Sequence, residues 1–100
     1  MIRPAYSYYA RHCAFFYAKN IHRTSFDTEI DKNNWYACHR AIGRYSDRDK
    51  DILLRVYGMR DTLADNIYEV SQIYCIDQNV IWDLLKDFER VVGEERGLVI

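Results

Sequence analysis

EVSQIYCIDQNVIWDLLKDFER, residues 69–90, is the stretch of the sequence that decides the fold. Apolar residues recur in it at helical spacing on both sides of a short interruption. They are Val70, Ile73, Tyr74, Val80, Ile81, Leu84, Leu85 and Phe88. Ile76 can fill the corner between the two patterns, and Asp77 stands where an aspartate caps the second helix. Two helices joined by so short a turn predict a helix-turn-helix.

The rest of the chain predicts three more helices and no strands. The single proline, Pro4, suits the first turn of a helix, and the glycines stand near the ends of helical patterns. Gly58 is expected in a left-handed turn and Gly93 at the end of the last helix. The predicted helices span residues 4–19, 31–42, 46–57, 62–74 and 77–92. The prediction is an all-α fold.

Length and composition indicate one domain. The chain has 100 residues, and 49% of them are hydrophobic, which is enough to form a core. Within this domain, residues 1–45 would form aromatic and basic N-terminal helices, and residues 46–93 the helix-turn-helix unit.

The formal net charge of −1 hides two halves of opposite sign. Residues 1–45 hold seven bases and three acids, a net of +4, whereas residues 46–100 hold seven bases and twelve acids, a net of −5. Such halves could fold onto each other, or two copies of the chain could stack head to tail.

A cytoplasmic protein is predicted, because three widely spaced cysteines suit free thiols in a reducing compartment and no signal sequence is recognisable.

Neither a cofactor nor catalysis is expected. No pair of cysteines or histidines has metal-ligand spacing, which predicts no metal site. The sequence also lacks a nucleophile elbow and a phosphate-binding glycine loop, so it is not expected to be an enzyme.

Three segments together resemble region 4 of sigma-70-type factors. They are SDRDKDILLRVYG (residues 46–58), EVSQIY (residues 69–74) and IDQNVIW (residues 76–82), and they cover the C-terminal half of the chain. The resemblance implies a helix-turn-helix whose last helix reads promoter DNA, in a transcription regulator or a sigma-like accessory protein. Sigma-like modules of this size occur as regulators in phages and mobile elements, and RNA polymerase or another regulatory protein would be the partner. Cys75 replaces the family's turn glycine and must accept a less favourable backbone angle.

The candidate DNA-binding residues lie on the last helix. Amide side chains can pair with adenine, and basic side chains can contact phosphates. The candidates are Gln78, Asn79, Trp82, Lys86 and Arg90. Alternatively, Gln78 and Asn79 are solvated first-turn residues and Trp82 packs on a neighbouring helix.

A protein-binding role is the alternative to DNA binding. The last helix carries Asp83, Asp87 and Glu89 among its bases, so the acidic C-terminal helices could face a basic protein surface. The aromatic first helix could serve as an interface too, and a homodimer is expected through it, although its rings could also stack on single-stranded bases. The candidate interface residues are Tyr6, Tyr9, Phe16 and Tyr17.

Overall fold

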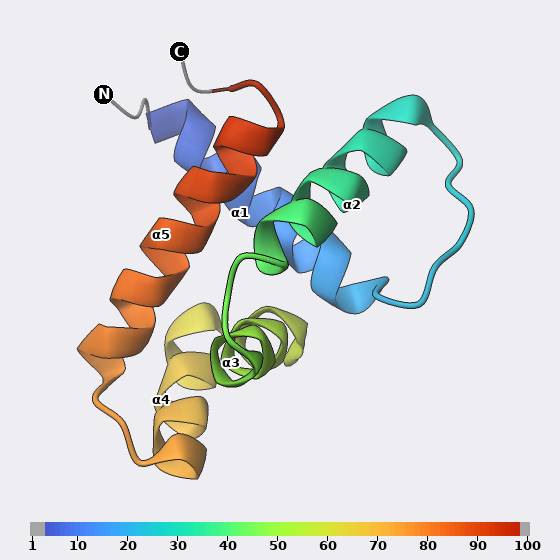
Figure 1. Cartoon of the computed structure of the whole chain (residues 1–100). Helices are drawn as coiled ribbons and strands as arrows, with labels where there is room; N and C mark the ends of the chain where they lie inside the picture. The colour runs from blue at the N-terminus through green and yellow to red at the C-terminus, as the bar shows by residue number, and fades with distance from the viewer. Residues whose placement is uncertain (1–3, 99–100) are drawn as a thin grey trace.

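The computed structural model describes residues 4–98, with side chains from Tyr8 onward. In this part of the chain the regular secondary structure consists of α-helices joined by loops. The helices are α1 (Pro4–Lys19), α2 (Glu29–Ile42), α3 (Asp47–Gly58), α4 (Leu63–Tyr74) and α5 (Gln78–Glu95). The long α5 runs along one side of the molecule, with α1 beside its C-terminal half and with α3 and α4 near its start (Figure 1). The predicted all-α class and the five helices are confirmed.

Four helices begin at a side chain that caps the first turn. Thr28, Ser46 and Thr62 each accept a hydrogen bond from the backbone N–H three residues later, at 3.1, 3.2 and 3.3 Å. Asp77 accepts one from the N–H of Asn79 at 2.7 Å. These bonds satisfy N–H groups that have no partner inside a helix. Because Thr28 provides the cap, α2 begins two residues before its predicted start.

Two predicted helix ends are wrong. Gly58 is the last residue of α3 rather than a left-handed turn, and Met59 ends the helix in an extended conformation. Gly93 lies buried inside α5, which continues to Glu95. Packing offsets the usual cost of a glycine in a helix, and the left-handed glycine after α5 is Gly97, with φ of 72°.

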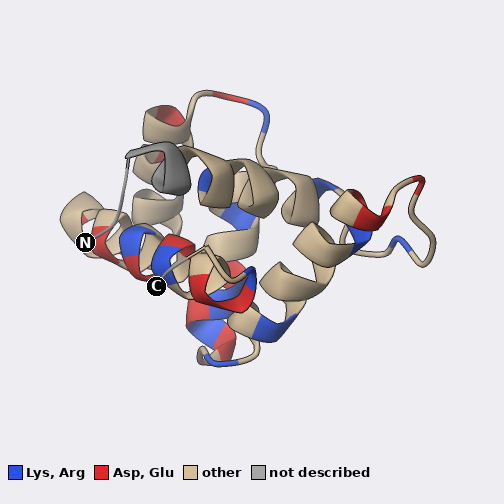
Figure 2. Cartoon of the chain, turned by 90° about the horizontal axis from the view of Figure 1, so that it is seen from above, with Lys and Arg blue, Asp and Glu red and all other residues tan. Residues whose placement is uncertain are grey.

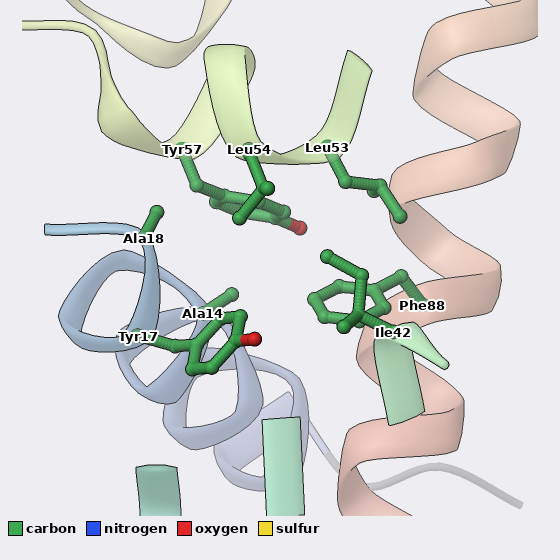
Figure 3. A pocket seen from close by; sticks show the side chains of 8 residues that line it. All are labelled: Ala14, Tyr17, Ala18, Ile42, Leu53, Leu54, Tyr57 and Phe88. Atoms are coloured by element: carbon green, nitrogen blue, oxygen red, sulfur yellow. The ribbon is translucent and has the colours of Figure 1, made fainter. Parts of the chain in front are cut away.

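The core lies where α5 meets the other helices. Its largest fully buried side chains include Tyr57, Phe88, Ile52 and Leu53. A narrow apolar gap remains between α1, α2, α3 and α5, and Figure 3 shows the eight side chains around it. The gap leaves no room for a water molecule, so it belongs to the packed core and is not a ligand site.

The oppositely charged halves of the chain meet inside one molecule. Arg11 of α1 pairs with Glu89 at 3.0 Å. Arg40 of α2 and Arg44, just after α2, pair with Glu95 at 2.9 and 2.6 Å. Figure 2 shows bases and acids side by side around the C-terminal end. The prediction that the halves can fold onto each other is confirmed.

Over residues 4–98, no helix has both the length and the hydrophobicity needed to cross a membrane.

Candidate functional site

The turn between α4 and α5 consists of Cys75, Ile76 and Asp77. Cys75 is left-handed, with φ of 55° and ψ of 45°, and it is the one residue other than glycine with positive φ in the described chain. Its N–H donates to the carbonyl of Ser71, as does the N–H of Ile76 at 3.1 Å. The unfavourable backbone angle predicted for Cys75 is thus confirmed.

The structure places four of the five DNA-binding candidates in solvent. Gln78, Asn79, Lys86 and Arg90 are exposed, whereas Trp82 is partly buried and packs against the core. Asn79, Lys86 and Arg90 share one face of α5 because seven and four residues separate them. Asp83 lies on the same face, between Asn79 and Lys86.

Arg90 does not present an isolated positive charge. Its guanidinium donates to the carboxylate of Asp87 at 2.8 Å and also pairs with Glu94. The hydroxyl of Tyr45 donates to Asp87 at 2.6 Å, and this bond, together with Arg90, lowers the pKa of the Asp87 carboxyl. Asp87 is therefore ionised at neutral pH and offsets Arg90.

The surface around the turn is acidic and apolar. Between Leu63 and Asp87 there are five acids and one base, Lys86, so the net charge is 1 − 5 = −4. All five acids are exposed: Asp65, Glu69, Asp77, Asp83 and Asp87. Three large apolar side chains in the same stretch of the chain are also exposed: Tyr68 (55%), Ile73 (54%) and Val80 (50%). We call the exposed side chains between Leu63 and Asp87 the α4–α5 surface.

The exposure of Ile73 and Val80 corrects their assignment to the buried faces of the two helices. The buried side of α4 runs through Asn66, Ile67, Val70 and Ser71. Ile73 lies at the border of this stripe, and no other helix covers that border. The sequence shows helical spacing in both cases, but spacing alone does not show which border residues a neighbouring helix covers.

The candidate interface residues of α1 lie in different environments. Tyr17 is in the core, only 2% exposed, and shares a 2.9 Å hydrogen bond with His39, so its ring offers no surface to a second copy. Tyr9 is partly buried and donates to Asn34 at 3.2 Å. Phe16 lines an open groove on the outer side of α1, and the side chain of Tyr6 lies outside the described residues.

The described residues hold no group of three or more His, Cys, Asp or Glu side chains that could bind a metal ion. Comparisons with protein families, with curated proteins and with solved structures find no match to this chain.

Proposed function

We propose that this protein is a non-catalytic regulator that binds a basic protein partner through the α4–α5 surface. The observation that carries the proposal is the net charge of −4 between Leu63 and Asp87, together with the exposed rings and branched side chains of Tyr68, Ile73 and Val80. Exposed apolar side chains supply contact area, and the surrounding carboxylates select a partner of opposite charge.

Proteins that bind nucleic acids have basic surfaces, because they must neutralise phosphates. Such a surface matches the α4–α5 surface in charge. We therefore expect the partner to be RNA polymerase or another regulatory protein that itself contacts DNA. The likeness of the sequence to sigma region 4 supports a role in transcription.

DNA binding by α5 is the second candidate function. The tight left-handed turn at Cys75 and the exposed amides of Gln78 and Asn79 at the start of α5 favour it. Against it, Lys86 is the single base between Leu63 and Asp87, and phosphates would meet Asp83 and Asp87 on the same side of the helix. We therefore favour protein binding over DNA binding.

Anisotropy titrations with three labelled probes separate the two functions. The probes are a helical Lys/Leu peptide, its Glu/Leu counterpart and a random-sequence DNA duplex. We expect the Lys/Leu peptide to bind and the other two not to bind. Asp83→Lys should weaken binding of the Lys/Leu peptide about tenfold, a loss of about 1.4 kcal/mol in binding free energy.

Two matched controls test whether the surface itself is responsible. Asp27→Lys makes the same change of charge at an exposed acid in the loop before α2 and should leave binding unchanged. Ile73→Ser should weaken binding, whereas Ile30→Ser, at an exposed isoleucine of α2, should not. The proposal would be refuted if the control substitutions weakened binding as much as those on the α4–α5 surface, or if the parent protein did not bind the Lys/Leu peptide. Salt-sensitive duplex binding that Lys86→Glu abolishes would establish the second function instead.

A further inference from the structure

The outer face of α1 carries a stripe of side chains opposite its buried face. The buried face consists of Ala10, Cys13, Ala14 and Tyr17. The stripe consists of Tyr8, His12, Phe15 and Lys19, at successive steps of four, three and four residues. This spacing keeps the four side chains in one line along the helix, as in the seam of two packed helices.

A groove of about 430 Å³ lies on this stripe, lined by His12, Phe15, Phe16, Lys19 and Asn20. The first four have positions i, i+3, i+4 and i+7, the set that forms a hole for one side chain of a facing helix. Other aromatic rings of the same molecule pack against the two phenylalanines that line the groove. Phe15 packs edge-on against Tyr57 at 5.4 Å between ring centroids, and Phe16 packs against Phe26 at 6.4 Å.

Tyr8 is a side chain of the kind that fills such a hole. It stands one turn before His12 on the same stripe and is 74% exposed, the largest value among the exposed large apolar residues of the described chain. Because Tyr8 and the groove belong to the same helix, Tyr8 cannot enter the groove of its own molecule. Tyr8 can instead enter the groove of a second molecule.

We propose that two copies of the chain associate through antiparallel α1 helices, with Tyr8 of each copy seated in the groove of the other. A two-fold axis makes both contacts at once, since the same surface serves both copies. With Tyr8 opposite residues 15–16, the axis passes close to His12. This association involves a different surface from the α4–α5 surface and does not depend on it.

The charges on the stripe agree with this arrangement. The residues that line the groove include no carboxylate, and the ammonium of Lys19 already lies 5.6 Å from the centroid of Phe15. In the dimer, Lys19 also meets the ring of Tyr8 from the other copy, which adds a cation–π contact. The two Lys19 side chains lie at opposite ends of the paired helices, so they do not repel each other.

The interface is small. Four seam residues from each copy bury less surface than a permanent dimer needs, which is above roughly 1,000 Å² in total. We therefore expect a monomer–dimer equilibrium that depends on concentration.

Sedimentation equilibrium over a wide concentration range tests the proposal. The parent protein should dimerise, and Tyr8→Ala should raise the dimer dissociation constant at least tenfold. Tyr68→Ala is the matched control, because it removes another exposed tyrosine, from α4, and should leave the constant unchanged. A parent protein that stays monomeric, or an unchanged constant for Tyr8→Ala, would overturn the proposal.

Cysteine cross-linking tests the antiparallel orientation in a Cys75→Ser background, which removes the exposed thiol. His12→Cys should form an intermolecular disulfide under mild oxidation, because the two positions lie near the axis. Lys19→Cys should not, because the two positions lie roughly 20 Å apart at 1.5 Å per residue. Cross-linking of Lys19→Cys would contradict the antiparallel arrangement. Binding of a labelled single strand by a monomer, lost in Tyr8→Ala, would assign the groove to nucleic acid instead.

Discussion

The hydroxyl of Tyr57 donates a 2.6 Å hydrogen bond to the carboxylate of Glu89. The Nε of Arg11 donates to the same carboxylate oxygen at 3.0 Å. Tyr57 is 1% exposed and Glu89 is 5% exposed, so protein donors take the place of water at this carboxylate. One buried acid therefore ties α1, α3 and α5 together.

Removing either member of this pair should destabilise the fold by different amounts. Tyr57→Phe removes one donor but leaves Arg11, so we expect a loss of about 1 to 2 kcal/mol in the free energy of unfolding. Glu89→Ala leaves a buried hydroxyl without an acceptor and opens a cavity, so the loss should be about 3 kcal/mol. Urea denaturation measures both, and equal losses would show that the carboxylate contributes nothing beyond its bond to Tyr57.

Stability should fall in alkaline solution. Burial raises the pKa of the Cys13 thiol to about 11 and that of the Tyr17 hydroxyl to about 12, and it holds the pKa of Tyr57 well above its ordinary value. The unfolded chain then loses these protons at lower pH than the folded chain. The stabilisation is complete below about pH 8 and is lost as the pH rises, by up to about 1.4 kcal/mol per pH unit for each group.

Urea denaturation at pH 8, 9.5 and 10.5 checks this dependence. The Tyr57→Phe variant lacks one of the titrating groups, so its stability should decline less steeply above pH 10. A parent protein equally stable at all three pH values would contradict the prediction.

Local signals in the sequence were sufficient to predict the helices. Capping residues such as Ser46 and Thr62 act within three residues of themselves. The unfavourable angle at Cys75 was expected from the resemblance to sigma region 4, in which a glycine occupies this position. Contacts between distant residues were not predictable in the same way. Glu89 looked like one more solvated acid on α5, because its partner Arg11 lies 78 residues away in the sequence.

The candidate sites show the same limit. Which aromatic side chains of α1 face outward depends on where α2, α3 and α5 pack, so Tyr17 was expected at an interface but lies in the core. Ile73 and Val80 were placed on the apolar faces of their helices by their spacing, yet both are exposed, because spacing does not show which residues a neighbouring helix covers. Tyr8 belongs to the aromatic cluster of the first helix that was expected to form an interface, but the sequence did not show that Tyr8 is 74% exposed.

Asn66 is a second buried polar group whose loss should be costly. Its side-chain nitrogen lies 3.0 to 3.3 Å from the carbonyl oxygens of Val56, Met59 and Asp61. It therefore donates hydrogen bonds to carbonyl groups in the last turn of α3 and just after it. Asn66→Ala should lower the free energy of unfolding by about 2 to 3 kcal/mol. Asn66→Asp should lower it further at neutral pH, because a carboxylate would face three carbonyl oxygens. Thermal and urea denaturation of both variants test this order, which an equally stable Asn66→Asp protein would contradict.

Cys75→Gly should stabilise the protein. A side chain in the left-handed region costs about 1 kcal/mol relative to glycine, and the Cys75 side chain is exposed, so little packing is lost. Cys75→Ala keeps the Cβ atom and should bring no comparable gain. Urea denaturation of the two variants distinguishes relief of the backbone angle from a general benefit of losing the thiol.

The position of α5 has a consequence for the order of folding during synthesis. α1, α2, α3 and α4 all pack against this helix, and it supplies the acids that pair with Arg11, Arg40 and Arg44. Until α5 leaves the ribosome, the four earlier helices can contact one another, but the apolar side chains that pack against α5 remain exposed and can bind chaperones. The core and the three ion pairs are therefore complete only after α5 has been synthesised.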